Sequence, residues 1–344
     1  MRRAGLFAAS GAFALLAALG ACATEKPAAP NVPDAIAVSY KVLPLSSTNP
    51  KEDRVGALIY RGGIEISSPE PRFGGWSGLM VSTDGTHLLS QSDEAHWLRA
   101  NLIYDAKGNL AGIEHAQLAD MQNLGGAAMV KKEGDAEGLA ALSPQGPDGP
   151  VIVSFEGNDR VWRYDVSHSL DVKPETVPMP DGIHTLKSNL GLEGLTMFRG
   201  HSILAVAEDT RDVNGDMKAW LVPYPSRDAD VQYGQLGVKA HAPYEISDAA
   251  MGPDGNLYLL ERHYFGPIGG VVCAVREIDR TSIKAGARLE GKEIAEFSMR
   301  ENIDNMEGLS LRRTPDGKTL LYMISDDNYN HAIQRTVLLM FELQ

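Results

Sequence analysis

The sequence predicts an all-β fold, a β-propeller, from a repeat of 55 to 60 residues, a glycine turn in each repeat, and weak helical periodicity throughout. A short motif opens each repeat. It is Ser-Gly-Leu at Ser77, Glu-Gly-Leu at Glu137, Glu193 and Glu307, and a diverged form at Asp248. The steps between these first members are 60, 56, 55 and 59 residues. Repeats of this length that are built from short strands are typical of propeller blades.

Each opening motif is followed by a turn and then by an apolar strand. The turns are Asp84-Gly85, Asp148-Gly149, Arg199-Gly200, Asp254-Gly255 and Asp316-Gly317. Asp-Gly between apolar runs indicates a hairpin, because the central residues of the tight turn need positive φ. The strands that follow are expected over 87–90, 151–154, 203–206, 257–260 and 320–323, and a third strand follows in most units.

We expect one propeller domain over residues 35–344, with six blades. Five units are visible in the repeat. The N-terminal strands over 36–45 and 55–66 are assigned to a sixth, which the C-terminal strand over 337–343 would complete. A five-bladed ring is the alternative. A β-sandwich explains the regular recurrence less well.

Residues 1–21 are predicted to be a signal peptide, because Met1-Arg2-Arg3 precedes a short apolar run that ends at Ala21. The run is too short for a comfortable membrane span. Leu19-Gly20-Ala21-Cys22 resembles the bacterial lipoprotein processing box, so Cys22 is the expected lipidation site; an ordinary signal peptide with an incidental cysteine is the alternative. Residues 22–34 contain three prolines and are expected to be a tether. The expected location is the bacterial cell envelope, on the outer membrane facing the periplasm, with membrane contact only through the lipid.

The formal net charge of -13 argues against nucleic acid or anionic lipid as the main partner. It is compatible with cation binding and equally with plain solubility. If Cys22 carries lipid, Cys273 has no partner within the chain. Its apolar surroundings, Val271 to Val275, indicate a small buried hydrophobic residue rather than a nucleophile. We expect a monomer.

Acidic residues also close the second strand of each unit. In an antiparallel hairpin the start of the first strand lies beside the end of the second. The opening and closing acids of one unit should therefore meet at one end of the blade. Because the first strand of a blade usually lines the channel, up to eight carboxylates are expected near one channel mouth. They form the pairs Glu137–Glu156, Glu193–Glu208, Asp248–Glu261 and Glu307–Asp326.

Carboxylates crowded in this way repel one another unless something neutralises them. A divalent cation with oxygen ligands is one answer, and Ca²⁺ is the ion expected here, with these eight acids as its candidate ligands. Arginines such as Arg160, Arg262 and Arg335 are a second answer, and protonation is a third. The acids could instead bond backbone amides between blades. Arg262 and His263 follow a closing acid and are the candidate catalytic residues, with the imidazole as a general acid or base.

Several runs resemble the phytase-like family, which carries the label "esterase-like activity of phytase". They are residues 73–79, 135–139, 189–195, 260–262, 304–309 and 325–328. The resemblance extends from about Phe73 to Leu343. It implies a propeller in an exported bacterial protein, and its label implies ester or phosphoester hydrolysis. The family motif highlights Glu137, Glu193, Glu261, Glu307, Asp326 and Asp327, and Ser77 departs from the acidic pattern.

Two functions follow from these observations. The first is a metal-dependent hydrolase of small phosphate or carboxylic esters. The second is a non-catalytic envelope propeller that binds a ligand or an envelope protein. The second predicts an apolar or aromatic patch at the channel mouth, to which Trp76, Trp97 and Tyr329 could contribute. The fold alone does not separate the two, because propellers serve both purposes.

Overall fold

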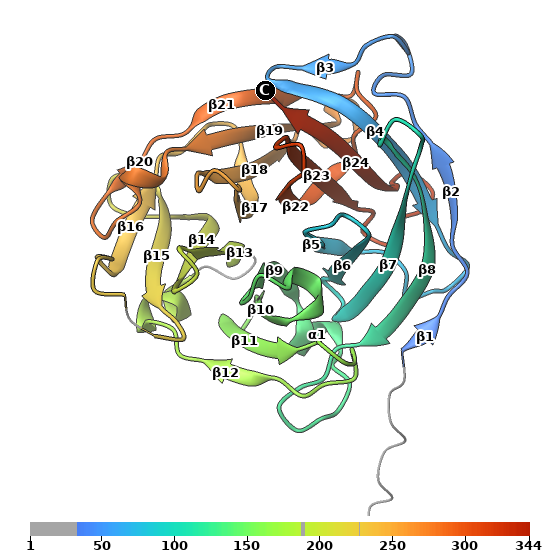
Figure 1. The fold of residues 1–344 in the computed structure, drawn as a ribbon. Helices are drawn as coiled ribbons and strands as arrows, with labels where there is room; N and C mark the ends of the chain where they lie inside the picture. The colour runs from blue at the N-terminus through green and yellow to red at the C-terminus, as the bar shows by residue number, and fades with distance from the viewer. Residues whose placement is uncertain (1–32, 187–189, 227) are drawn as a thin grey trace, which may run out of the picture. The chain divides into compact units, whose positions relative to one another are not determined.

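The computed structural model describes residues 33–186, 190–226 and 228–344, which form the predicted β-propeller around a central channel (Figure 1). The expected signal peptide, Cys22 and most of the expected tether lie outside the described residues. Helices are few and short, α1 (Lys131–Gly134) and α2 (Gly266–Gly269) among them. Within the described ranges, no helix has the length and apolar character needed to cross a membrane.

Five four-stranded antiparallel units make up the described propeller. Each begins with a strand beside the channel and continues outward: β5 (Trp76–Val81), β6 (His87–Ser92), β7 (His96–Tyr104) and β8 (Leu110–Asp120); β9 (Ala136–Ala141), β10 (Pro150–Phe155), β11 (Arg160–Asp165) and β12 (Glu175–Val177); β13 (Leu192–Phe198), β14 (Ser202–Arg211), β15 (Met217–Pro223) and β16 (Gly234–Val238); β17 (Glu245–Met251), β18 (Leu257–Tyr264), β19 (Val271–Ile278) and β21 (Lys292–Phe297); β22 (Asn305–Arg313), β23 (Thr319–Asp326), β24 (Thr336–Leu343) and β4 (Leu58–Ser67). Short strands β1 (Asp34–Ala35), β2 (Ser39–Val42), β3 (Arg54–Val55) and β20 (Arg288–Leu289) lie at the edges of these sheets.

The N-terminal strands do not form the separate sixth unit that the sequence led us to expect. β4 pairs antiparallel with β24, as in Thr336↔Ile66, and so becomes the outer strand of the unit that begins with β22. The five inner strands contact their neighbours around the channel. The pairings of the described strands therefore match the five-bladed alternative. The ring closes when a strand from the start of the chain joins the last sheet, and this protects a sheet edge.

The glycine of the opening motif has a packing role. A Cβ atom on Gly138 would lie 2.6 Å from the carbonyl oxygen of Glu193 and 2.7 Å from Cβ of Leu195, both in the next inner strand. A Cβ atom on Gly308 would lie 2.9 Å from the carbonyl carbon of Gly78. Neighbouring inner strands thus approach too closely for any side chain at these positions.

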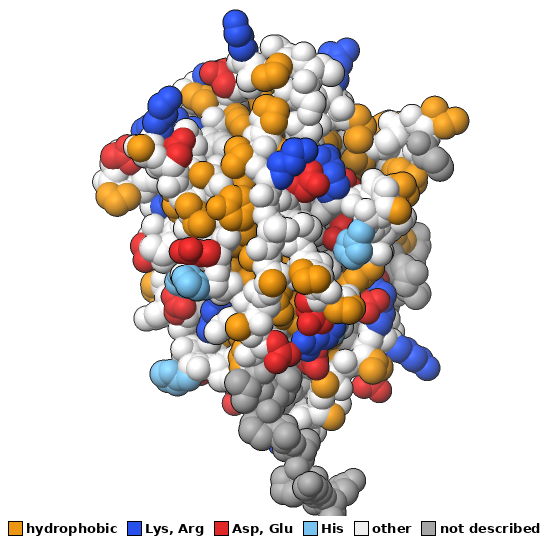
Figure 2. All heavy atoms as spheres, turned by 90° about the vertical axis from the view of Figure 1, so that its right-hand side faces the viewer, with side chains coloured by type: hydrophobic (Ala, Val, Ile, Leu, Met, Phe, Trp, Pro, Cys, Tyr) orange, Lys and Arg blue, Asp and Glu red, His pale blue; other side chains and the backbone are white. Residues whose placement is uncertain are grey.

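All five inner strands begin at one face of the propeller, and the second strands, which run antiparallel to them, end at that face. We call it the acidic face, because Glu137, Glu193 and Glu307 lie at the starts of β9, β13 and β22. The opposite channel opening is called the far mouth. On the flank that Figure 2 shows, Lys and Arg side chains are scattered among acidic and apolar ones without a continuous basic area.

Candidate functional site

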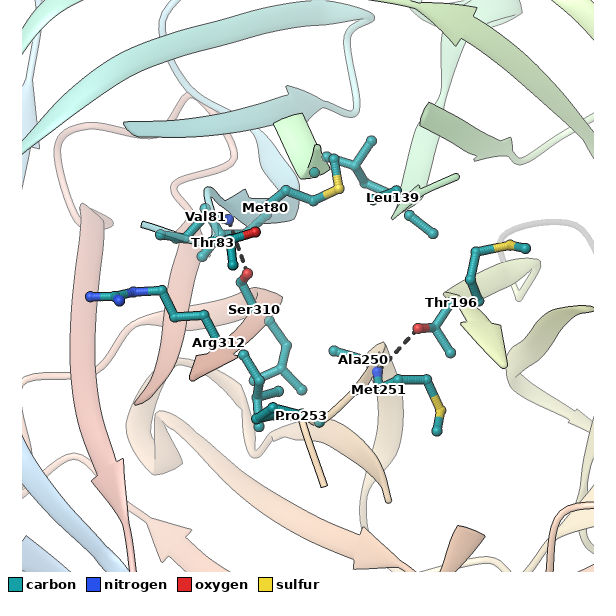
Figure 3. A pocket seen from close by; sticks show the side chains of 18 of the residues that line it. Met80, Val81, Thr83, Leu139, Thr196, Ala250, Met251, Pro253, Ser310 and Arg312 are labelled. Carbon is teal, nitrogen blue, oxygen red and sulfur yellow. Dashed lines mark hydrogen bonds between the residues drawn. The ribbon is translucent and has the colours of Figure 1, made fainter. Parts of the chain in front are cut away.

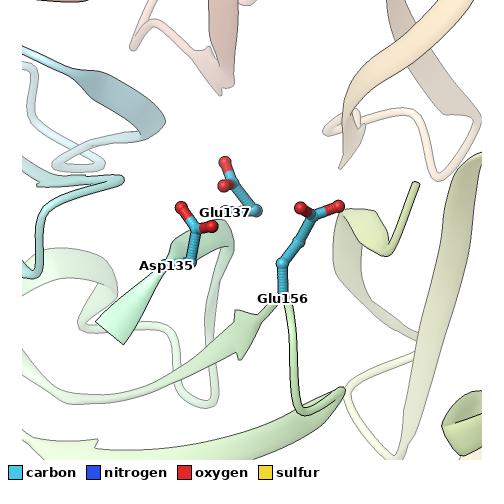
Figure 4. Close-up of side chains that lie close together, drawn as sticks. All are labelled: Asp135, Glu137 and Glu156. Atoms are coloured by element: carbon cyan, nitrogen blue, oxygen red, sulfur yellow. The ribbon is translucent and has the colours of Figure 1, made fainter. Parts of the chain in front are cut away.

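Two groups of three carboxylates lie together at the acidic face. Asp135, Glu137 and Glu156 form the first group (Figure 4), and Glu156, Glu193 and Glu208 form the second. Within each group one oxygen atom per residue lies within 4.8 Å of the others. Glu156 belongs to both groups, so five carboxylates form one continuous acidic centre.

A β-bulge places each opening glutamate. The pairing of β9 with β10 shifts by one residue around Glu137, and the pairing of β13 with β14 shifts in the same way around Glu193. The same shift surrounds Ser77 and Glu307. A bulge inserts an unpaired residue and redirects its side chain, which is how these positions can face their neighbours across the channel mouth.

The bulge also corrects the expected alignment of the fourth unit. There the register passes from Ile246↔Glu261 to Asp248↔Leu260, so the bulged residue is Ser247. Asp248 therefore occupies the position that glycine holds in the other units. Two of the five bulge positions carry serine, Ser77 and Ser247, and the acidic centre lies to one side of the channel axis instead of forming a complete ring.

Burial and mutual repulsion perturb these carboxyl groups. Burial, and after it the neighbouring carboxylates, raise the pKa of Glu137 and of Glu193 well above the usual value. Burial raises the pKa of Glu208 to about 8, against the opposing effect of Arg262. Burial also raises the pKa of Glu156. In the absence of a cation, the centre therefore retains protons that ordinary carboxylates would have lost by neutral pH.

Few hydrogen-bond donors or cations of the described chain offset the negative charge of the acidic centre. Glu156 Oε1 accepts a hydrogen bond from the backbone N–H of Gly191 at 2.6 Å. Glu193 is only 8% exposed, and no hydrogen bond or ion pair to another described residue is found for its carboxylate. Arg262, on β18, lies between two acids: its Nε is 2.7 Å from Glu307 Oε1 and its Nη2 is 3.6 Å from Glu208 Oε1.

The site also includes three residues that were not selected from the sequence. Asp135 belongs to the first carboxylate group, and the ammonium of Lys131, on α1, lies 3.1 Å from its Oδ1. Lys131 also forms an ion pair with Asp93. The available signal was local: Asp135 stands two residues before Glu137 in the run Asp-Ala-Glu-Gly-Leu.

The fifth unit contributes Glu307 and Asp326 beside the centre. Burial raises the pKa of Glu307, and burial followed by the charge of Glu307 raises the pKa of Asp326 to about 8. Asp326 Oδ1 accepts a hydrogen bond from the backbone N–H of Asn328 at 2.6 Å. The opening and closing acids of this unit thus influence one another electrostatically, although neither belongs to the two groups of three.

Asp248 and Glu261 have other partners. Asp248 bonds the backbone N–H of Ala249 at 2.7 Å and that of Leu309, in the next unit, at 2.6 Å. This is the inter-blade backbone bonding that was weighed as an alternative. Glu261 is fully buried and pairs with Arg276, with Nε and Oε2 separated by 2.7 Å; the same oxygen is 2.9 Å from His241 Nδ1. Both carboxylates are therefore engaged by other groups of the chain.

His263 does not lie with the acidic centre. Neighbouring side chains of a strand point to opposite faces, so a strand that directs Arg262 toward Glu307 directs His263 away. The imidazole of His263 packs edge-on against Phe265, with ring centroids 4.5 Å apart. Of the expected aromatic patch, Trp76 and Trp97 are fully buried in the core and are not available at the channel mouth.

The far mouth has a different chemistry. A cavity of about 370 Å³ opens there, and Figure 3 shows Met80, Leu139 and Met251 at its wall. Two of its hydroxyl groups accept hydrogen bonds from backbone amides. Ser310 Oγ accepts a hydrogen bond from the N–H of Val81 at 3.0 Å, and Thr196 Oγ1 accepts one from that of Met251 at 3.1 Å. Arg312 and Arg313 also line this cavity, but its lining includes no carboxylate, and the two groups of carboxylates lie at the acidic face.

Comparisons with known proteins agree with the resemblance found in the sequence. The family described as "Phytase-like: esterase-like activity of phytase" matches residues 71–329, which include both carboxylate groups. Curated proteins include no match. Among solved structures, a glucose dehydrogenase matches with 12% sequence identity and a TM-score of 0.40, covering 77% of this chain and 96% of that chain. A likeness this weak supports no statement about activity.

Proposed function

The chain belongs to the phytase-like family, and from that premise we propose that it hydrolyses phosphate or carboxylic esters with the help of a divalent cation, Ca²⁺, at the acidic face. The observation that carries the proposal is that two groups of three carboxylates lie side by side and have Glu156 in common. The label of the family is consistent with ester hydrolysis, and the acidic centre is the part of the described chain with the chemistry for it.

The donor set fits a hard cation. All five side chains of the centre offer carboxylate oxygens, which are the ligands that Ca²⁺ prefers, usually in sets of about six to eight. Glu193 is buried at the centre, and no ion pair to another described residue is found for its carboxylate, so a cation bound there would replace the proton that burial otherwise retains. Because Glu137, Glu193 and Glu208 have raised pKa values, a cation would bind in exchange for protons.

Asp135, Glu137, Glu156, Glu193 and Glu208 would hold the cation, which when bound would polarise the ester and lower the pKa of a bound water. Arg262 is placed beside the centre to orient an anionic group of the substrate. Asp326 would carry a proton on Oδ2 near neutral pH, because its pKa is raised to about 8 and Oδ1 is engaged by Asn328. It is the group of this chain best suited to act as a general acid.

The test is turnover of p-nitrophenyl phosphate and p-nitrophenyl acetate by the purified protein, with Ca²⁺ and with a chelator. We expect chelation to abolish turnover and added Ca²⁺ to restore it. Glu156→Gln should lower kcat/KM by at least about 100-fold, because one change alters both carboxylate groups. Glu133→Gln, which removes the same charge from an exposed site on α1, is the matched control. Activity that survives both chelation and Glu193→Gln would contradict the proposal.

A non-catalytic ligand-binding or assembly propeller is the second candidate. The observation in its favour is that Tyr264, at the end of β18, and Phe265, which follows it, are more than half exposed at the acidic face. It predicts no turnover with any divalent cation and an envelope protein retained when the full chain is isolated.

We also propose that the protein is lipid-anchored through Cys22 in the bacterial envelope and faces the periplasm. The mass of the mature N-terminal peptide tests this, because lipidation adds the mass of the acyl chains to a peptide that begins at Cys22.

A further inference from the structure

We propose that the acidic face docks on a lipid surface through apolar residues in the loops that surround the channel mouth. The first group of these residues lies at the end of β18 and in its connection to β19. Tyr264, the last residue of β18, and Phe265 are more than half exposed, and Ile268 is fully exposed. Met299, also more than half exposed, packs beside the same connection, since a Cβ atom on Gly270 would lie 2.6 Å from its Cγ. We call these four side chains the apolar tip.

The other loops of this face carry similar residues. Val130 precedes β9, Val213 connects β14 with β15, and Ile333 connects β23 with β24. Each of the three is more than half exposed, and Val213 is exposed completely. Across the described ranges, the remaining exposed large hydrophobic residues are Leu124, also in a loop of this face, and two residues of the outer strand β2. The turns of the far mouth contain none, so apart from the two residues of β2 the exposed large hydrophobic side chains lie at one end of the propeller.

The start of the described chain points to a lipid surface as the occupant. β1 runs antiparallel to β8, and Asp34 pairs with Leu118, two residues before β8 ends at Asp120. Arg72 holds this junction through ion pairs to Asp34 at 2.7 Å and to Asp120 at 3.1 Å. Because β8 ends at the acidic face, the chain enters the propeller at that face.

The length of the preceding segment limits how far this face can be from an anchor. Cys22 is eleven residues before Pro33, where the described chain begins, and eleven residues span at most about 40 Å when fully extended. Lipidation at Cys22 and docking through the apolar loops would both place the acidic face near the bilayer. A soluble protein partner or a second copy of the chain would have no need for the apolar loops and the chain entry to share one face.

The charge of the molecule selects the kind of lipid. The chain has a formal net charge of -13, and the acidic centre lies at the docking face. A zwitterionic surface is therefore favoured over an anionic one, and contact should depend on burial of apolar side chains. Docking in this orientation would bring the carboxylate groups to esters at the membrane surface.

The experiment uses the full lipidated chain in phosphatidylcholine vesicles, with one engineered cysteine labelled by bimane. Cys273 is fully buried, and burial raises the pKa of its thiol, so it stays unlabelled in the folded protein. We compare Ile268→Cys, in the apolar tip, with Lys107→Cys, an exposed position in the β7–β8 turn at the far mouth. Brominated acyl chains quench only a label that enters the hydrocarbon. We expect at least twofold quenching at position 268 and none at 107.

Equal quenching at the two positions, or none at either, would overturn the proposal. Quenching that disappears in 1 M salt would also overturn it, because adsorption would then be electrostatic. A change in bimane fluorescence at position 268 that depends on protein concentration and not on vesicles would assign this face to a second copy of the chain. The double variant Phe265→Ser, Ile268→Ser should keep its thermal unfolding temperature, since both side chains are more than half exposed. It should lose the quenching of a bimane label introduced by Val213→Cys. None of these readouts needs turnover, so failure of the proposed hydrolase activity leaves them interpretable.

Discussion

Removing cations at alkaline pH should destabilise the fold through the acidic centre, and Glu208 provides the magnitude. Burial raises its pKa from 4.5 to about 8. Between these two values the folded protein binds more protons than the unfolded chain. The stabilisation is therefore fully present below pH 4.5 and is lost as the pH rises through about 8. Glu137 and Glu193 change the free energy of unfolding in the same direction, since their pKa values are also raised.

Each pH unit between the two pKa values changes the free energy of unfolding by about 1.4 kcal/mol, so Glu208 alone accounts for roughly 5 kcal/mol by pH 8.5. This is a large part of the roughly 5–15 kcal/mol that holds an ordinary domain folded. A cation that binds only the folded protein returns about 2.7 kcal/mol at 100 times its Kd. Calcium should therefore matter more at pH 8.5 than at pH 5.5.

The assay is urea unfolding at pH 5.5 and pH 8.5, with a chelator and then with Ca²⁺. In chelator the unfolding midpoint should fall as the pH rises, and Ca²⁺ should restore much of the loss at pH 8.5. Glu208→Gln, which cannot ionise, should reduce the pH dependence, whereas the exposed control Glu133→Gln should leave it unchanged. If the protein in chelator has the same urea midpoint at both pH values, burial does not raise the pKa values of these carboxyl groups as reasoned, and the argument is refuted.

Three further predictions concern the fold and are checked by chemical denaturation or thiol labelling. Gly138→Ala should lower the free energy of unfolding by about 1–3 kcal/mol, because its Cβ atom would meet the carbonyl oxygen of Glu193 at 2.6 Å. Arg276→Met should cost about 3–5 kcal/mol, because it leaves the fully buried Glu261 without its arginine partner and with His241 alone beside it. Cys273 should not react with a thiol reagent until the protein unfolds, because the thiol is fully buried.

Each of these predictions has a control. Gly125→Ala, whose nearest new contact is Asn123 Oδ1 at 3.2 Å, should change stability little, and an equal loss at both glycines would show that inner-strand packing is not the cause. The double variant Glu261→Gln, Arg276→Met should lose less stability than Arg276→Met alone, since no buried charge is left without a partner. Labelling of Cys273 at the rate of an exposed thiol would contradict its position in the core.

The repeat carried most of the information in the sequence. Glu137 and Glu193 were expected beside Glu156 and Glu208, and hairpin geometry alone was enough to place them, because the first and last residues of a hairpin meet at its open end. Asp248 was aligned one residue away from the true bulge position. The motif of the fourth unit has diverged, and only the register of β17 on β18 identifies Ser247 as the bulged residue.

The repeat pattern did not predict in which direction the side chains near the closing acids point. Arg262 and His263 are neighbours in sequence, yet only Arg262 contacts the acids of the site, since adjacent residues of a strand face opposite ways. Glu261 carries the same closing-acid signal as Glu156. It is neutralised by Arg276, which stands fifteen residues later on the neighbouring strand β19 and which no local spacing selects.

The sequence by itself determined the propeller fold, the hairpins and the presence of paired acids, because these depend on a repeat, on turn residues and on strand alternation. The pairing of the strand over 55–66 with the C-terminal strand was also expected, but tertiary structure alone decided that these two strands complete the sheet of β22 and that five carboxylates gather on one side of the channel. It also decided which acids bond the backbone or a buried arginine instead. The physical reason is that ring closure, bulge register and charge pairing join residues from different blades, and these contacts leave no periodic signal along the chain.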